Sequence, residues 1–267
     1  MKKRLVFFKW CITSFQIMLL LGIVACSNNN SKSVQQDEEN NGETIQSLSF
    51  KVIKKEIPCH RDTEYQPTYY ANVEYPTTGP KDLVDNIRDW INQTVYEAWE
   101  ADDVNNFSLY SGNMEDADAL VSHYLKLETK TDYPYDEISL NFYKVYETDK
   151  YVSITAELRR AYADYFKNNN CATFLKSNSK RLSTNRVFEK FDKKTKEIIW
   201  QYKDDDFSWL CPENVHEIDF SGMDICLQGD SIRFYIPNIP GRSSGTIIVP
   251  TSSLEMYLSK EIKSLLQ

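Results

Sequence analysis

The sequence predicts an α+β fold with an antiparallel sheet, two helices after the first strand pair and a further helix at the C-terminus. Runs in which apolar and polar residues alternate occupy much of the chain, which is typical of half-buried strands. Two amphipathic helical patterns lie together after the first two runs, and helices do not otherwise alternate with strands. This segregation favours an α+β domain over a parallel α/β sheet.

A strand pair and two helices make up the first part of the predicted domain. Residues 47–57 alternate apolar and polar side chains, and residues 67–75 are rich in aromatic and β-branched side chains. Residues 78–80, Thr-Gly-Pro, begin a helix, with proline in its first turn. Its apolar face consists of Leu83, Val84, Ile87, Ile91, Val95 and Ala98, flanked by Trp90 and Trp99. Asn113 is expected to cap a second helix over residues 114–127.

The second half of the chain is predicted to be mainly strand. Two long strands, residues 138–147 and 151–162, flank a hairpin turn. The shorter strands expected after them are residues 172–177, 186–192, 197–200, 215–220, 223–227, 231–236 and 245–249. A last helix begins at residues 250–252 and turns its apolar residues inward. These residues are Leu254, Tyr257, Leu258, Ile262 and Leu265.

The N-terminal segment predicts export and lipid attachment. Residues 1–25 start with a basic stretch and continue as a mostly apolar run, the layout of a secretory signal peptide. Residues 23–26, Ile-Val-Ala-Cys, resemble a lipobox, the processing site of bacterial lipoproteins. We therefore expect Cys26 to become a diacylated N-terminus. An uncleaved transmembrane anchor is the alternative, although Lys9 interrupts the apolar run.

A tether is expected to join this anchor to the folded part. Residues 26–45 are polar, rich in asparagine and glutamine, and lack apolar periodicity. Residues 46–267 are long enough for one domain, with residues 46–130 and 131–267 as an alternative division into two subdomains.

The charge of the chain argues against a polyanionic partner. The first 25 residues hold four basic and no acidic side chains, which leaves 27 basic and 39 acidic residues and a net charge near −12. Nucleic-acid binding needs many lysine and arginine contacts to phosphate, so we expect no nucleic-acid partner. A cationic partner is favoured instead, because opposite fields speed encounter.

Four cysteines remain in the expected mature domain besides the lipidated one. Cys59, Cys171, Cys211 and Cys226 allow three disulfide pairings. The turn residues Ser221 and Gly222 favour Cys211–Cys226, and Cys59–Cys171 would then follow. Free buried thiols are the alternative.

Several local runs resemble one family of extracellular domains. They are Gly229–Pro237, Gly245–Pro250 and Leu254–Leu258 at the C-terminal end, with Phe191–Ile198 and Lys150–Ile154 before them. In order and content they are similar to the extracellular domain of the RsiV family of bacterial anti-sigma factors, which sense lysozyme. They also resemble the accessory domain of PdaC-type peptidoglycan deacetylases.

That resemblance covers about residues 47–267 and implies an α+β fold and a binding role. Many family members carry a Gly-Gly-Ala-His run where this chain has Arg160–Phe166, without glycine or histidine. We therefore do not expect a function tied to that loop, or the sigma-factor function, to carry over.

Two groups of side chains are candidate ligand contacts. Strand alternation places Tyr69 and Tyr75 on one face, and tyrosines suit interfaces and sugar platforms, although core packing is the alternative. His216, Glu217, Asp219 and Asp224 form the densest group of acids and histidine. His216 and Asp224 could relay a proton if they converge across a hairpin, and an exposed strand with charged residues is the alternative.

Recognisable cofactor chemistry is missing from the sequence. No second ligand pair accompanies Cys59 and His60 at metal-site spacing, so no metal is expected. Glycine-rich phosphate loops are absent as well, and we expect no cofactor. Residues 241–245 match the letters of a nucleophile elbow but precede a strand, so we interpret them as a loop.

Together these features predict a lipid-anchored cell-envelope protein that is a non-enzymatic binding module. Its partner would be a cationic protein such as a lysozyme, or a glycan such as a peptidoglycan fragment. A cell-wall hydrolase using His216, Asp219 and Asp224, and a purely structural component, are the alternatives. Ser27 after the lipidated Cys26 favours the outer membrane of a Gram-negative bacterium, by resemblance to known sorting rules.

Overall fold

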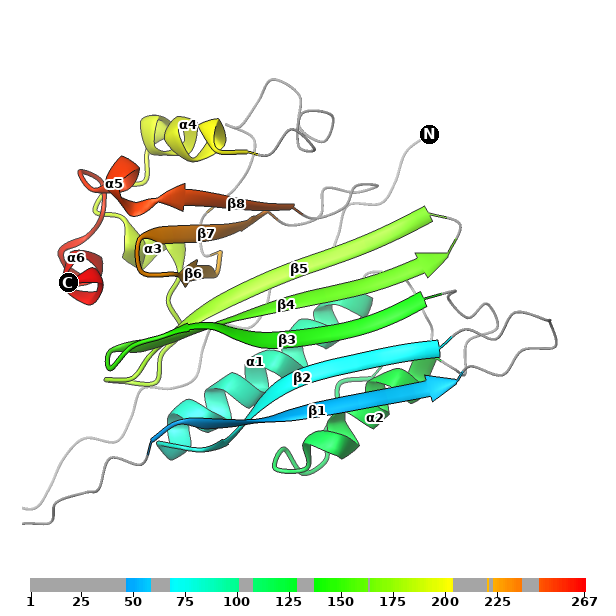
Figure 1. The fold of residues 1–267 in the computed structure, drawn as a ribbon. Helices are drawn as coiled ribbons and strands as arrows, with labels where there is room; N and C mark the ends of the chain where they lie inside the picture. The colour runs from blue at the N-terminus through cyan, green and yellow to red at the C-terminus, as the bar shows by residue number, and fades with distance from the viewer. Residues whose placement is uncertain are drawn as a thin grey trace, which may run out of the picture. The chain divides into compact units, whose positions relative to one another are not determined.

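A five-stranded sheet is the largest element of the structure, which is a computed structural model (Figure 1). The structure describes residues 47–58, 68–100, 108–128, 137–162, 164–203, 220, 223–236 and 245–267, without the side chains of residues 99–100 and 161–168. The predicted signal peptide and tether, residues 1–25 and 26–45, lie outside the described residues. No helix in the described part of the chain is long and apolar enough to cross a bilayer.

The strands of this sheet follow one another in chain order. They are β1 (Ser49–Pro58), β2 (Thr68–Thr78), β3 (Glu137–Glu147), β4 (Tyr151–Tyr162) and β5 (Asp164–Leu175). β2 and β3 run parallel, with Tyr69 opposite Ile138, whereas the other neighbouring strands of this sheet are antiparallel. A parallel pair needs a long crossover, and the two helices between β2 and β3 supply it.

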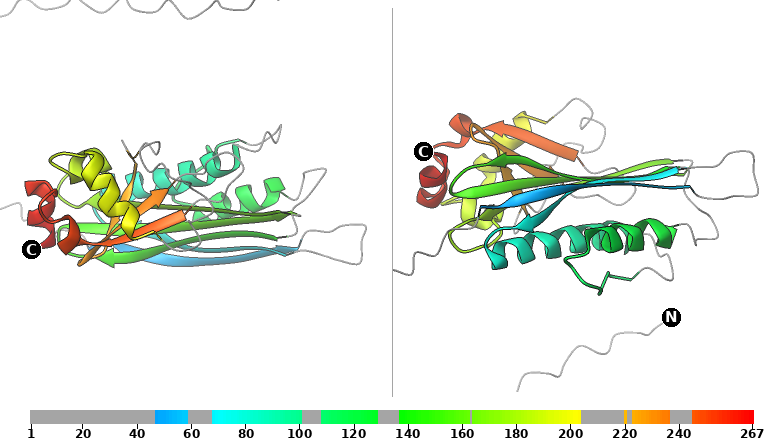
Figure 2. Two further views of the ribbon diagram at one scale, coloured as in Figure 1. Left: turned by 90° about the horizontal axis from the view of Figure 1, so that it is seen from above. Right: turned by 60° about the horizontal axis from the view of Figure 1, so that its bottom comes forward.

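The helices α1 (Lys81–Glu100) and α2 (Ala117–Glu128) cover one face of this sheet (Figure 2). The predicted apolar stripe of α1 is buried there, and Trp90 packs edge-on against Phe142 of β3 and Phe174 of β5. The α2 cap differs from the prediction. Asp116 accepts a hydrogen bond from Ala119 N at 2.9 Å and starts the helix, whereas Asn113 closes the preceding turn.

A second, three-stranded antiparallel sheet lies on the opposite face, at one end of the large sheet (Figure 2). It consists of β6 (Ile225–Leu227), β7 (Ser231–Ile236) and β8 (Gly245–Pro250). With it pack α3 (Thr184–Val187), α4 (Lys193–Gln201), α5 (Thr251–Leu254) and α6 (Lys260–Leu266), around a second apolar core. The α+β class predicted from the sequence is confirmed.

Buried hydroxyls join the two sheets. Thr173 of β5 donates to Ile225 O at 2.9 Å and accepts from Leu227 N at 2.9 Å. Ser153 of β4 donates to Leu227 O at 2.7 Å. Because each of these groups is paired, the polar contact between the sheets carries no penalty for unsatisfied hydrogen bonds.

Two strand predictions in the middle of the chain are wrong. Residues 184–187 form α3 in place of the start of a strand, and residues 193–201 form α4 in place of a turn and a strand. The Asp192 carboxylate accepts from Thr195 N at 3.1 Å and caps α4, whose buried residues Thr195 and Ile199 have helical spacing. The predicted last helix is divided into α5 and α6.

Candidate functional site

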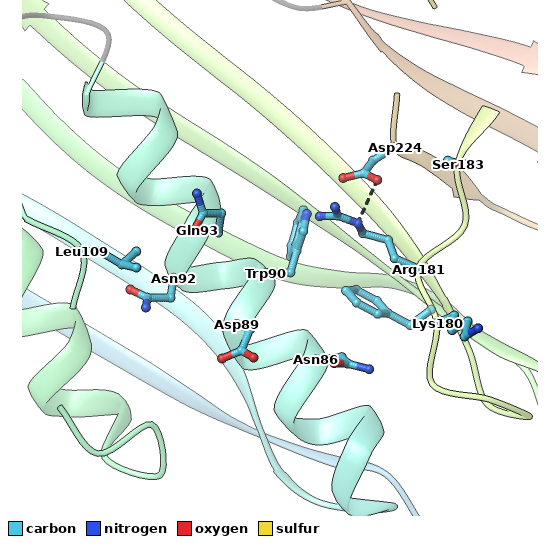
Figure 3. A pocket seen from close by; sticks show the side chains of 11 residues that line it. Asn86, Asp89, Trp90, Asn92, Gln93, Leu109, Lys180, Arg181, Ser183 and Asp224 are labelled. Carbon is cyan, nitrogen blue, oxygen red and sulfur yellow. Dashed lines mark ion pairs between the residues drawn. The ribbon is translucent and has the colours of Figure 1, made fainter. Parts of the chain in front are cut away.

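A polar cleft of about 760 Å³ lies between α1 and the segment that follows β5 (Figure 3). Its lining residues are Asn86, Asp89, Trp90, Asn92, Gln93, Leu109, Phe174, Lys180, Arg181, Ser183 and Asp224. Most of them carry hydrogen-bonding groups, while Trp90 and Phe174 belong to the core beneath. Ligand sites are concave and carry a small number of convergent polar groups, and on these two grounds we take this cleft as the candidate site.

α1 supplies one wall and the floor. Helical periodicity buries Trp90, which is 3% exposed, and leaves Asn86, Asp89 and Gln93 exposed on the adjoining side of the helix. Asn92 is already used by the fold. It donates to Tyr110 O at 2.9 Å, and its side-chain oxygen accepts a short hydrogen bond from Tyr124.

The facing wall forms because the chain reverses after β5. Ser179 has a positive φ of 59°, a conformation that non-glycine residues adopt rarely. The amide of Asn86 on α1 donates to Ser179 O at 2.8 Å and ties this turn to the helix. The chain then runs back along β5, where Leu182 N donates to Thr173 O at 2.8 Å. Lys180 and Arg181 are therefore held opposite α1.

Asp224 is the residue just before β6, and its side chain lines the cleft. A backbone bridge pairs it with Ser183, and its Oδ1 lies 3.0 Å from Nε of Arg181 (Figure 3). The Asp224 side chain is 13% exposed. Burial raises the pKa of this carboxyl from 3.8 to about 6, although the Arg181 guanidinium and the nearby Trp90 N–H both lower it.

The indole N–H of Trp90 is the notable group on the floor. Figure 3 shows the nitrogen edge of the ring turned toward Arg181 and Asp224. It lies near enough to Asp224 to lower the pKa of that carboxyl. Yet among the described residues this buried nitrogen makes no hydrogen bond of normal geometry. An unsatisfied buried donor costs about 1–3 kcal/mol, so such groups call for a partner.

The charges of the cleft are balanced. Lys180 and Arg181 face Asp89 and Asp224, so neither a polyanion nor a polycation is favoured by net attraction inside the cleft. The groups available to a ligand are mainly hydrogen-bond donors and acceptors. Within the described residues no three His, Cys, Asp or Glu side chains are grouped so as to hold a metal ion.

Of the residues predicted from the sequence to contact a ligand, the structure places one in the cleft and two in the core. Asp224 lines the cleft, whereas His216 and Asp219 lie outside the described residues, so their convergence stays a prediction. Tyr69 and Tyr75 do share a face of β2, but it is the core face, where they are 0% and 1% exposed. The prediction that they contact a ligand is therefore wrong. They are core residues, because α1 and α2 pack on that side of the sheet and bury it.

The cysteines are only partly described. Cys171 and Cys226 are buried free thiols, and they lie close enough to each other to interact. Cys226 donates to Ile154 O with a sulfur–oxygen distance of 3.1 Å. Cys59 and Cys211 lie outside the described residues, and the structure shows no disulfide at Cys171 or Cys226, as in the alternative of free buried thiols.

Sequence reasoning missed the partners of Asp224. Trp90 stood out as a large residue beside the apolar stripe of α1, but no pattern joined it to Arg181. Their meeting depends on the reversal after β5 and on the bridge between Ser183 and Asp224. Both are tertiary features without a sequence signature.

Comparison with known proteins identifies the fold. The chain matches no family model, and no curated protein matches it. Among solved structures it is similar to a DUF3298 family member from Bacteroides fragilis NCTC 9343, with 12% identity and a TM-score of 0.54, covering 81% of this chain and 95% of that one. It is also similar to a DUF3298 family protein from Pseudomonas aeruginosa PAO1, with 11% identity, a TM-score of 0.53 and coverage of 81% and 96%. These similarities show a fold shared with domains of unknown function.

Proposed function

We propose that this chain is a lipid-anchored, non-enzymatic binding protein of the bacterial cell envelope that holds a glycan, such as a peptidoglycan fragment, in the cleft beside α1. Cys26 carries the anchor, and Ser27 after it favours the outer membrane of a Gram-negative bacterium. The cleft is the observation on which the binding role depends. The motif resemblance to RsiV-type and PdaC-type extracellular domains also supports a role at the cell wall.

The chemistry of the cleft favours a glycan over the other partners expected from the sequence. Sugars present many hydroxyls and little charge, and they are bound by planar amide, carboxylate and guanidinium groups. Asn86, Asp89, Gln93 and Arg181 supply such groups at the rim of the cleft. Since its charges are balanced, binding in the cleft should depend weakly on salt.

A cationic protein such as a lysozyme is the second candidate, and the acidity of the chain favours it. The formal net charge is −8, and α1 presents exposed carboxylates beyond the cleft, such as Asp82. Opposite charge accelerates protein association and makes it sensitive to salt. Salt dependence therefore separates the two candidates.

Calorimetric titration of the full-length chain in mild detergent tests the proposal. Soluble peptidoglycan fragments and a lysozyme are the two ligands, each at low and high salt. We expect saturable fragment binding that changes little with salt. Asp89→Ala in the cleft should weaken it, while the matched change Asp82→Ala on the same helix should not. Salt-sensitive binding of the lysozyme alone would refute the glycan function in favour of the second candidate.

Activity and anchoring have their own tests. Reducing-end and mass-spectrometric assays should find the fragments intact after incubation, and cleavage would favour the hydrolase alternative instead. Cells producing the Cys26→Ser variant should release the chain from the membrane fraction, whereas the unchanged chain stays with it.

A further inference from the structure

We propose that the floor of the cleft recognises the secondary amide group of an N-acetylated sugar, with Trp90 Nε1–H donating to the amide carbonyl and Asp224 accepting from the amide N–H. This inference rests on the proposed glycan function and names the chemical group that the cleft selects.

The donor half of the inference comes from Trp90. Its indole nitrogen is buried, lies at the floor of the cleft and lacks a hydrogen bond of normal geometry among the described residues. Indole N–H is a donor only, so its complement must be an acceptor such as a carbonyl oxygen. A ligand carbonyl there would replace its poorly aligned contact with Asp224 by a hydrogen bond of normal geometry.

The acceptor half comes from Asp224. Its Oδ1 is engaged by Arg181 at 3.0 Å, and its Oδ2 forms no ion pair with any of the described residues. A carboxylate can accept several hydrogen bonds, so this side chain keeps the capacity to accept an N–H. A donor and an acceptor side by side are the complement of one secondary amide, which presents a carbonyl oxygen and an N–H together.

The rest of the lining favours a sugar-borne amide over a peptide bond. Asn86, Asp89 and Gln93 are exposed along the wall and suit neighbouring hydroxyls. A peptide would bring apolar side chains to this wall, where amides and a carboxylate would be desolvated without partners.

Two oligosaccharides that differ in this group test the inference. Chitotetraose carries an acetamido group where cellotetraose has a hydroxyl, on the same type of β-1,4-linked chain. Titrated into the full-length chain, chitotetraose should bind about tenfold more tightly, the scale of one or two good hydrogen bonds. Trp90→Phe should remove most of this preference. Trp200→Phe on α4, which does not line the cleft, is the matched control and should leave it unchanged.

The other outcomes separate this inference from the proposed function. Equal affinity for both sugars would keep the glycan function and overturn the amide recognition. Tighter binding of an N-acetylated tripeptide than of chitotetraose would overturn the assignment to a sugar. If neither sugar nor a peptidoglycan fragment binds, the glycan function itself fails. Should Trp90→Phe not fold, as judged by circular dichroism, Asp224→Ala removes the acceptor and must reduce the preference in the same way.

Discussion

Asp224→Asn should stabilise the folded chain at neutral pH. Burial raises the pKa of the Asp224 carboxyl from 3.8 to about 6, even with Arg181 beside it. A carboxyl with a raised pKa holds its proton more tightly in the folded than in the unfolded chain. Its ionised form therefore costs stability once the pH rises above these values.

The size of the effect follows from the pKa difference. About two pKa units at 1.36 kcal/mol each correspond to roughly 3 kcal/mol above the folded-state pKa. The folded-state pKa already includes the attraction of Arg181, a half-exposed partner, so the lost ion pair is not subtracted a second time. We therefore expect Asp224→Asn to gain up to roughly 3 kcal/mol at about pH 7.5. The gain should shrink as the pH falls through 6 and should be small near pH 4, just above the unfolded-state pKa of 3.8.

Urea denaturation followed by circular dichroism, at several values between about pH 4 and pH 7.5, measures this gain. Asp118→Asn is the control of opposite sign. The Lys55 hydrogen bond lowers the pKa of the Asp118 carboxyl, so that variant should lose stability at neutral pH. A less stable Asp224→Asn protein at about pH 7.5 would refute the reasoning, because Asp224 would then stabilise the fold on balance.

Three further predictions concern residues outside the cleft. Tyr75→Phe removes the 2.6 Å hydrogen bond to Met114 O and should cost about 1 kcal/mol in urea denaturation without changing ligand affinity. Gly229→Ala should lower the melting temperature in a thermal scan, since Gly229 has φ of +72° and a Cβ there would lie 2.7 Å from the Tyr146 hydroxyl; an unchanged value would contradict this. Burial raises the pKa of the Cys226 thiol, so iodoacetamide should label it in urea but not in the folded chain, as mass spectrometry would show.

Local patterns predicted the elements that local forces decide. The stripe of α1 and the hairpin of β3 and β4 follow from periodicity and turn residues, and the structure confirms both. α4 was missed because Lys193–Lys196 resembles a turn, while the Asp192 cap and the burial of Thr195 and Ile199 make it helical. The parallel alignment of β2 and β3 was missed because strand pairing over such a separation leaves no periodicity in the sequence.

The site was less predictable than the fold. Asp224 was selected because acids and a histidine are dense near it, yet the partners that the structure gives it are Arg181 and Ser183, from another part of the chain. Alternation correctly placed Tyr69 and Tyr75 together, but it could not tell which face of β2 the helices cover. Sequence patterns identify which side chains share a face of a helix or strand, whereas a cleft depends on which of these faces meet in the fold.

The parallel pairing of β2 with β3 also determines how the chain reaches its fold. β1 with β2, and β3 with β4 and β5, are hairpins between chain neighbours, and each can form early. The edge shared by β2 and β3 can close only when the whole crossover containing α1 and α2 has been drawn together, at a cost in chain entropy. We therefore expect the sheet to assemble as two halves whose joining limits the rate of folding, and the cleft, which needs both α1 and the turn after β5, to be completed only at that step.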